Sequence, residues 1–381
     1  MKRYPYRLLL LLPVFCFLFL GCGKDDPCDN PPSSKRRTVL VYLGTDNNFS
    51  HEAAEKIDIL KKKWKGSNDG NLLVYADAGA NPVLVHIYHS KLRGNVADTI
   101  NIYAVENSAD PATFARMLHR AKEYRPADSY GLVVLSHATG WLPAEMSHPD
   151  IALKSVILDT GADEANNYME LSDFVNAIPY PLDFIVFDAC FMGSVEVCYE
   201  LKDKVAYIVS SPAEVLAPGF VYSTMMQHLF APVADLTAVA RDFYEYYDSR
   251  AGFYRSATVS VVKTSELEAL ATVVSEIIHP NIHPNDFENI QTFGYGRQKI
   301  YFDLGDYLQK LSPENRQRIQ NALNQCIIYK AHTPSYYSAG TRAMHAIQAF
   351  SGLTVYIPQA AYPQTNNAYG MLKWTERTGV W

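Results

Sequence analysis

The sequence has few cysteines, no excess of basic residues and only one long apolar run. Three of its six cysteines precede residue 37, which leaves Cys190, Cys198 and Cys326 for the folded part. An odd number without a close pair argues against a disulfide framework, and no CxxC pair or His/Cys spacing indicates zinc. A formal net charge of −6 gives no electrostatic footprint for nucleic acid. The absence of G-x-S-x-G, P-loop and G-x-G-x-x-G motifs argues against serine hydrolases, NTPases and dehydrogenases.

The single apolar run lies at the N-terminus and predicts an export signal. Lys2 and Arg3 precede apolar residues 8–20, a stretch too short for a stable transmembrane helix. The run ends at FLGC, which resembles a bacterial lipobox whose Cys22 becomes the acylated first residue. The following GKDD resembles the export signal of Bacteroidetes surface lipoproteins. We therefore expect a signal peptide at 1–21, a lipid anchor at Cys22 and a surface-exposed protein on the outer membrane; the alternative is an ordinary secreted protein.

Beyond the signal, a polar, Pro-rich stretch at 22–36 predicts a flexible tether. From residue 37 onward, short apolar runs alternate with helical patterns. Such alternation predicts an α/β fold with a mostly parallel central sheet and helices on both faces. No strong linker divides 37–381, so we expect one domain and a monomer. The strands are expected near 38–44, 72–77, 83–88, 131–136, 155–158, 183–188, 205–210, 257–263 and 351–358, and the helices near 50–64, 111–124, 170–178, 193–202, 222–250, 264–276, 303–310 and 314–329.

Two of the apolar runs end in reactive side chains. GLVVLSHATGW carries His137, and DFIVFDACFMGS carries Cys190. Each run predicts a short buried strand that stops at a turn of small residues. In open α/β sheets the active crevice lies at the carboxyl ends of the strands, so neighbouring strands would bring thiol and imidazole together as nucleophile and base. The alternative for Cys190 is a buried structural thiol, which is the expected role of Cys198 and Cys326.

These two segments also carry a family resemblance. SHATGW and DACFMGSVEVCYEL resemble the two signatures of clostripain-like cysteine peptidases, family C11 of the caspase-like clan. TVLVYLGTDNNF, SVILDTGADEANNYMELSDF, SSPAEVLAPGFVY, FDLGDYLQ and GLTVYIP extend the similarity over most of the chain. The resemblance implies a caspase-like three-layer α-β-α sandwich, peptide or protein substrates and no cofactor. Members of this family differ in calcium dependence, and no EF-hand loop or acidic ladder indicates calcium here.

The resemblance also implies roles for individual residues. Cys190 would attack the scissile carbonyl, and His137 would protonate the leaving amine without forming a tight ion pair. The backbone N–H groups of Cys190 and Ala138 would hold the oxyanion. Ala138 stands where the family normally has Gly, and its Cβ would penalise any positive φ that the turn needs. This departure keeps two other classes open: a catalytically impaired surface binding or scaffold lipoprotein, and another thiol acyl-transfer enzyme.

Asp188 precedes Cys190 by two residues, so within a strand both side chains would point to one face, about 6.6 Å apart. A carboxylate there would attract a cationic P1 side chain, and the resemblance implies cleavage after Arg or Lys with Asp188 as the substrate-binding residue. The alternative is a capping or structural Asp at the strand end.

Two further segments have open roles. Asp46, Asn47 and Asn48 follow the first strand, where they either form a turn or support the site. Lys154 is the only Lys or Arg between His137 and Cys190, so basic specificity makes it the candidate for self-cleavage in this segment.

Overall fold

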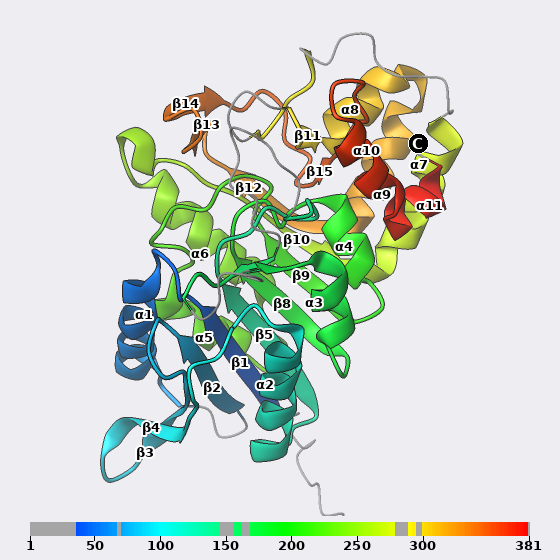
Figure 1. Cartoon of the computed structure of the whole chain (residues 1–381). Helices are drawn as coiled ribbons and strands as arrows, with labels where there is room; N and C mark the ends of the chain where they lie inside the picture. The colour runs from blue at the N-terminus through cyan, green and yellow to red at the C-terminus, as the bar shows by residue number, and fades with distance from the viewer. Residues whose placement is uncertain are drawn as a thin grey trace, which may run out of the picture. The chain divides into compact units, whose positions relative to one another are not determined.

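The computed structural model describes residues 36–66, 70–144, 156–161, 168–278, 289–294 and 299–379 (Figure 1). All of these residues belong to one compact unit, Lys35–Trp381. The expected signal peptide, the Cys22 anchor, the first part of the tether and Lys154 lie outside the described residues. No helix in the described ranges combines the length and apolarity that a membrane span requires.

The strands of the central sheet come from both halves of the chain. They are β1 (Arg37–Gly44), β2 (Gly70–Asp77), β3 (Val83–Ser90), β4 (Gly94–Ile102), β5 (Ser129–Leu135), β8 (Leu182–Asp188), β9 (Val205–Ser210), β10 (Thr258–Lys263) and β12 (Ile327–His332). In the described part of the chain these make a 9-stranded sheet in the order β12-β10-β9-β8-β5-β1-β2-β3-β4. The central strands β9, β8, β5, β1 and β2 pair in parallel, and only β3 and β10 run against the others. The expected mostly parallel sheet is therefore confirmed.

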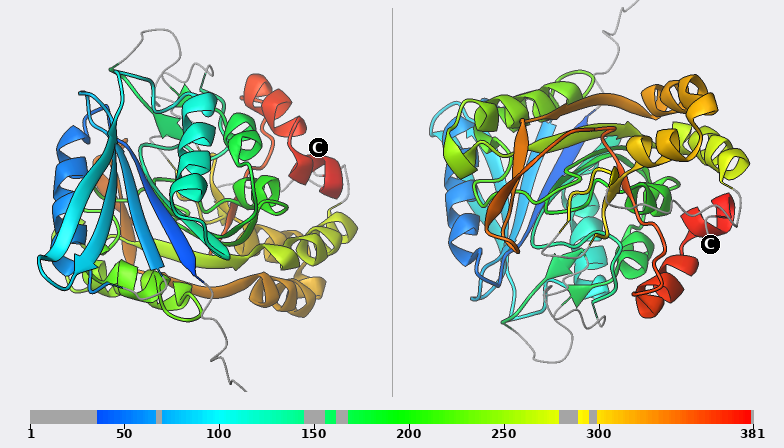
Figure 2. Two further views of the ribbon diagram at one scale, coloured as in Figure 1. Left: turned by 90° about the horizontal axis from the view of Figure 1, so that it is seen from below. Right: turned by 90° about the horizontal axis from the view of Figure 1, so that it is seen from above.

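Helices cover both faces of this sheet (Figures 1 and 2). One face carries α1 (Ser50–Lys63), α5 (Tyr222–Leu229) and α6 (Leu236–Asp248). The other carries α2 (Pro111–Tyr124), α3 (Leu171–Ala177), α4 (Val195–Leu201) and α7 (Leu267–Ile277). Alternate residues of β8 explain the arrangement, because Ile185 and Phe187 pack on the second face whereas Phe184 and Val186 pack on the first. The result is the expected three-layer α-β-α sandwich.

The C-terminal elements extend the layer that contains α4 and α7. They are α8 (Leu304–Leu311), α9 (Arg316–Cys326), α10 (Pro363–Gly370) and α11 (Lys373–Thr378). The described residues also form the short 3-10 turns η1 (Gly252–Tyr254), η2 (Thr264–Glu266) and η4 (Pro313–Asn315). Among the described residues, small two-stranded sheets pair β6 (Ile157–Leu158) with β7 (Tyr168–Met169), β11 (Phe302–Asp303) with β15 (Thr354–Val355), and β13 (Ser335–Ser338) with β14 (Ala343–Ala346).

Local sequence signals account for most boundaries. Helix α2 begins as expected: the carboxylate of Asp110 accepts a hydrogen bond from the N–H of Ala112 at 3.2 Å, and Pro111 occupies the first turn. The helical pattern expected over 222–250 is divided between α5 and α6. Pro232 lies in the break, and Asp235 caps the new helix through the N–H of Ala238.

Other differences concern strands at the edges. The helix expected over 314–329 ends at Cys326, where the chain turns directly into the edge strand β12. Strand β4 and the β13–β14 hairpin were not expected, because β4 has no buried residue and the hairpin lacks a buried apolar run. The strands expected at 155–158 and 351–358 shorten to two-residue pairings, β6 and β15.

Candidate active site

His137 and Cys190 follow neighbouring strands at matched positions. Strands β5 and β8 pair in parallel, and the last paired residues are Leu135 and Asp188. His137 lies two residues beyond Leu135, and Cys190 lies two residues beyond Asp188. Both residues are half-buried, whereas the last five residues of each strand are buried. Continuing the register past the paired ends therefore brings the imidazole and the thiol to the same edge of the sheet.

The imidazole of His137 is held from the loop that follows β1. Its Nε2 lies 2.5 Å from Oδ1 of Asn48, and its ring stacks on Phe49 with centroids 4.0 Å apart. Asn47 fixes this loop, since its side-chain amide donates to the carbonyls of Leu158 at 2.8 Å and Gly44 at 3.3 Å. The sequence left open whether this segment forms a turn or supports the site, and it does both: Asn47 holds the turn, and Asn48 contacts His137.

The thiol of Cys190 is held from the loop that follows β9. The N–H of Val215 points at Sγ from 3.3 Å, and Sγ lies 3.7 Å from the carbonyl oxygen of the same residue. A backbone N–H directed at the sulfur stabilises negative charge there. Helix α4 begins only at Val195, capped by Ser194, so Cys190 lies in the turn that precedes the helix.

The turn after Cys190 has unusual backbone geometry. Phe191 has φ +59°, the left-handed region that side chains other than Gly rarely adopt. The N–H of Phe191 donates to the carbonyl of Ala213 at 3.1 Å, and the N–H of Gly193 donates to that of Ser211 at 2.9 Å. These bonds to the 211–221 loop hold the strained turn and fix where Cys190 lies.

Ala138 is buried and does not have a positive φ. The Cβ penalty anticipated for Ala138 is therefore absent from this turn. Gly140 has the positive φ instead, +68°, and a Cβ there would come within 2.7 Å of the carbonyl oxygen of Phe191. The position in the His137 loop that requires glycine is thus two residues further along, where the loop meets the Cys190 turn.

Asp188 is buried on the face of the sheet that carries α1, α5 and α6. Its Oδ1 accepts a hydrogen bond from the N–H of Phe220 at 3.2 Å, and a Cβ on Gly219 would come within 2.3 Å of its Oδ2. Gly219 therefore covers the carboxylate in this conformation. Strand β8 ends at Asp188, and Cys190 packs against the cluster on the opposite face. The prediction that the two side chains point to one face is therefore wrong, because the strand ends between them.

The charge of Asp188 is balanced from helix α1. Burial raises the pKa of Asp188 to about 6, whereas the ammonium group of Lys56 opposes that rise. Lys56 is itself buried: its Nζ lies 2.7 Å from the carbonyl oxygen of Pro218 and 3.1 Å from a carboxylate oxygen of Glu52. The carbonyl oxygen of Pro218 accepts a hydrogen bond from Lys56, and the N–H of Phe220 donates one to Asp188. The 218–220 turn therefore contacts both charged groups.

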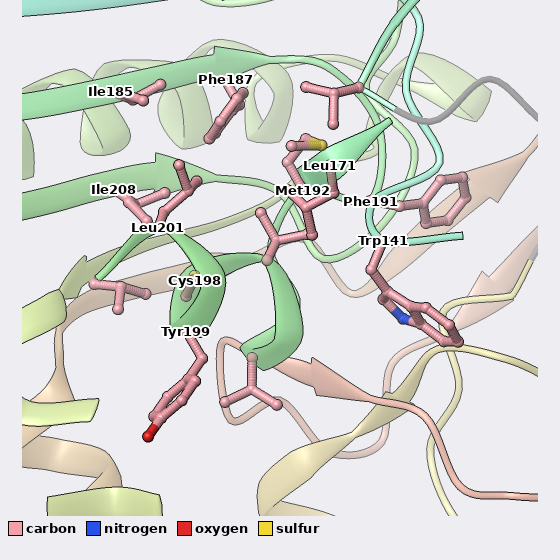
Figure 3. Close-up of a cluster of buried hydrophobic side chains, with 14 of the residues drawn as sticks. Trp141, Leu171, Ile185, Phe187, Phe191, Met192, Cys198, Tyr199, Leu201 and Ile208 are labelled. Carbon is pink, nitrogen blue, oxygen red and sulfur yellow. The ribbon is translucent and has the colours of Figure 1, made fainter. Parts of the chain in front are cut away.

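The remaining cysteines have the structural role expected of them. Cys198 and Cys326 are fully buried, and neither they nor Cys190 form a disulfide. Burial raises the pKa of Cys198 well above its usual range and that of Cys326 to about 12. Figure 3 shows Cys198 on α4 among apolar side chains, with Trp141 and Phe191 at one end of the same cluster. These thiols are packed and unreactive.

A group of three aspartates includes Asp46, which belongs to the same loop as Asn48. Asp46, Asp77 and Asp159 interact at the strand ends, where burial and the other two carboxylates raise the pKa of Asp77 to about 8. Asp159 accepts hydrogen bonds from the N–H and hydroxyl of Ser108 at 2.6 and 2.9 Å. Within the described ranges, no group of three or more His, Cys, Asp or Glu residues has an arrangement that could hold a metal ion.

Sequence reasoning did not identify Val215 or Phe191 as parts of the site. Val215 lies in SSPAEVLAPGFVY, a segment that resembles the family and therefore carried a usable signal. Phe191 directly follows Cys190, but nothing in its residue type predicts a positive φ.

Comparison with known proteins agrees with this geometry. The model of the clostripain family matches residues 41–377. Clostripain from Hathewaya histolytica is 21% identical over 411 residues, which cover 86% of this chain and 76% of that protein. A secreted C11 cysteine protease from Bacteroides thetaiotaomicron, solved in complex with an irreversible peptide inhibitor, is 30% identical with a TM-score of 0.80 and covers 90% of this chain and 98% of its own. An inactive zymogen C11 protease from Parabacteroides distasonis is 32% identical with a TM-score of 0.80, covering 91% and 99%. The chain belongs to the clostripain family and is a cysteine peptidase.

Proposed function

We propose that this cysteine peptidase is an endopeptidase in which Cys190 and His137 form the catalytic dyad. The observation that carries the proposal is the register of β5 and β8. Because Leu135 pairs with Asp188, the thiol and the imidazole follow adjacent parallel strands at the same offset. Cys198 and Cys326, the other described cysteines, are buried in the core and cannot meet a peptide.

In this proposal the thiol of Cys190 gives its proton to His137 and attacks the scissile carbonyl, whose oxygen becomes an oxyanion. The N–H groups of Ala138 and Cys190 donate to that oxygen, one from each loop. His137 donates a proton to the leaving amine, which departs as the acyl-enzyme forms. Water then attacks the thioester, which releases the acyl part as a new C-terminal carboxyl group and returns Cys190 as the thiol. A non-catalytic role was considered because Ala138 would be strained at a positive φ. Ala138 does not have a positive φ, so this argument for a non-catalytic role does not apply.

We further propose that Asp188 selects substrates with Arg or Lys at P1. Asp188 and Glu52 are acidic and Lys56 is basic, so the buried cluster has one negative charge in excess when all three are ionised. An incoming guanidinium or ammonium group would balance that charge in a desolvated setting. Gly219 covers the carboxylate here, so binding requires the 218–220 turn to move.

Peptides that differ only at P1 test both assignments. The wild type should cleave fluorogenic peptides with Arg or Lys at P1 and leave those with Leu at P1 nearly uncut. Cys190→Ala and His137→Ala should abolish cleavage, whereas the matched thiol control Cys326→Ala should retain it. A Cys190→Ala protein as active as the wild type would overturn the dyad, and equal cleavage of the Leu peptide would overturn the basic specificity.

Self-processing at Lys154 is a separate proposal. Lys154 is the only basic residue between His137 and Cys190, and an inactive zymogen is known for the Parabacteroides distasonis relative. Mass analysis of the wild type beside Cys190→Ala should show fragments that join at Lys154 and Ser155 only in the wild type. An intact, fully active chain would show that no cleavage is needed.

The cellular location also remains a proposal. The FLGC sequence supports acylation of Cys22 and anchoring in the outer membrane, with the peptidase exposed at the cell surface. Expressed in the native cell type, the wild type should sediment with envelope membranes and be removed by external protease. Cys22→Ala should lose both properties; unchanged membrane association of that variant would refute the anchor.

A further inference from the structure

Tyr301 touches both loops of the proposed site although it lies far from them in the sequence. It directly precedes β11, in the C-terminal part of the chain, and its side chain is 1% exposed. Its backbone is tied down, since the carbonyl oxygen of Tyr301 accepts a hydrogen bond from the N–H of Phe293 at 2.8 Å. The chemical steps proposed above do not use this residue.

The two contacts of Tyr301 are directional. Its hydroxyl donates to the carbonyl oxygen of Thr139 at 2.8 Å, one residue beyond Ala138. Its ring lies flat on the ring of Phe191, with centroids 4.4 Å apart and an angle of 10° between the planes. The first contact fixes the peptide plane after Thr139, and the second supports the residue that has a strained backbone next to Cys190.

The two loops also meet directly beside Tyr301. Gly140 approaches the carbonyl oxygen of Phe191 so closely that a Cβ would come within 2.7 Å of it. Backbone packing and the side chain of Tyr301 therefore both contribute to the distance between the His137 loop and the Cys190 turn. That distance matters because one proposed oxyanion donor, the N–H of Ala138, lies in the first loop and the other, the N–H of Cys190, lies in the second.

We propose that Tyr301 is a positioning residue that holds the two oxyanion donors in register, through its hydroxyl on Thr139 and its ring on Phe191. This inference rests on the proposed function. Preorganised donors act on the transition state only when both reach the same oxygen, and a displacement of a fraction of an ångström weakens one of them. Burial raises the pKa of Tyr301 well above its usual range, so its hydroxyl keeps the proton it donates throughout the working pH range.

Conservative replacement of Tyr301 tests the inference. Tyr301→Phe keeps the ring on Phe191 and removes only the hydroxyl. We expect kcat on an Arg peptide to fall about tenfold with KM within about twofold, because the oxyanion exists only in the transition state. A peptide aldehyde ending in Arg, which adds to the thiol as a tetrahedral hemithioacetal, should bind more weakly by a similar factor. Alkylation of Cys190 by iodoacetamide forms no oxyanion and should keep its rate.

The matched control is Tyr307→Phe, which removes the hydroxyl of another buried tyrosine, on α8. It should leave kcat, aldehyde affinity and alkylation unchanged. Tyr301→Leu, which also removes the ring, should lower kcat further than Tyr301→Phe. All rates are expressed per mole of folded protein, measured by near-UV circular dichroism, because misfolded chains would expose Cys198 and Cys326 to iodoacetamide.

Two results would overturn the inference. One is a Tyr301→Phe variant with wild-type kcat and aldehyde affinity per folded molecule. The other is a variant whose alkylation is slowed as much as its turnover, which would show general damage to the site. Failure of the proposed function is distinguishable, because Cys190→Ala would then keep the activity of the wild type whatever stands at position 301.

Discussion

The amide oxygen of Asn48 lies 2.5 Å from Nε2 of His137, a contact between residues 89 positions apart. An amide oxygen only accepts hydrogen bonds, so this contact places a proton on Nε2. In the proposed reaction, the proton given to the leaving amine must then come from Nδ1. The ring of Phe49 stacked on the imidazole restricts its rotation. Asn48 and Phe49 together therefore set the tautomer and the orientation of the general acid.

Replacement of Asn48 should affect chemistry more than stability. Asn48→Ala should lower kcat by about tenfold with little change in KM, because the imidazole loses its orientation. Asn48→Asp should move the alkaline limb of the pH–rate profile to higher pH, since a carboxylate favours the imidazolium. Asn71→Ala is the control: it removes an amide contact to Thr38 at the other end of β1, so it should leave the profile unchanged. An unchanged kcat in Asn48→Ala would exclude Asn48 from the site.

Asp188→Asn should separate activity from stability. Burial raises the pKa of Asp188 from 3.8 to about 6. A carboxyl group with a raised pKa binds its proton more tightly in the folded state, so the free energy of unfolding falls as pH rises from about 4 to about 6 and stays lower above that. The amide removes this penalty, and the variant should have the higher Tm at pH 8 but not at pH 4.

The same variant should lose its preference for basic substrates. Removing a desolvated counter-charge should weaken transition-state binding of an Arg peptide by about 2–4 kcal/mol, or roughly 30- to 1000-fold in kcat/KM. Thermal melts at both pH values and kcat/KM for Arg and Leu peptides are the measurements. Full activity on the Arg peptide would move the specificity role to another acid, for which Glu214 in the 211–221 loop is the next candidate.

Lys56 should control the pH at which Asp188 loses its proton and can bind a basic P1 side chain. The groups that face Asp188 are Glu52 and Lys56 from α1, Tyr222 from α5 and Tyr247 from α6. Burial raises the pKa of both tyrosines, so they stay neutral and Lys56 supplies the positive charge. Without it, Asp188 should hold its proton to higher pH.

Lys56→Met should therefore shift the acid limb of the pH profile for Arg peptides to higher pH. Lys56→Arg should restore the wild-type profile. The control is Lys62→Met, which removes an exposed lysine from the same helix, and it should leave the profile unchanged. A profile of Lys56→Met identical to that of the wild type would show that Lys56 does not influence the charge of Asp188.

The parts of the fold that the sequence predicts are those set by local burial. His137 and Cys190 could be placed at strand ends because β5 and β8 are short apolar runs that stop at small residues. Asp110 and Pro111 likewise mark the start of α2 without reference to any other element. The edge strand β12 was missed because alternate residues such as Ile328 and Lys330 face outward, and its pattern continues that of the preceding helix.

The site details that could not be predicted depend on contacts between distant segments. The residues next to Asn48 do not indicate that it contacts His137, and those next to Tyr301 do not indicate that it contacts Thr139. Both contacts form only when the folded sheet brings distant segments together. The burial of Asp188 under Gly219 follows in the same way from the path of the 211–221 loop. Strand periodicity placed Asp188 and Cys190 on one face, but β8 ends between them.

In the His137 loop, replacing Gly140 by alanine should be damaging, whereas replacing Ala138 by glycine should have little effect. Gly140→Ala introduces a Cβ at φ +68° and within 2.7 Å of the carbonyl oxygen of Phe191. We expect it to lower the free energy of unfolding by about 1–3 kcal/mol and to reduce kcat, because the Cys190 turn must move away. Ala138→Gly, which makes the loop resemble the usual family sequence, should change kcat by less than about twofold, because Ala138 does not have a positive φ. Denaturant melts and kcat for the two variants give the comparison. A large gain of activity in Ala138→Gly would show that the alanine hinders the oxyanion site after all.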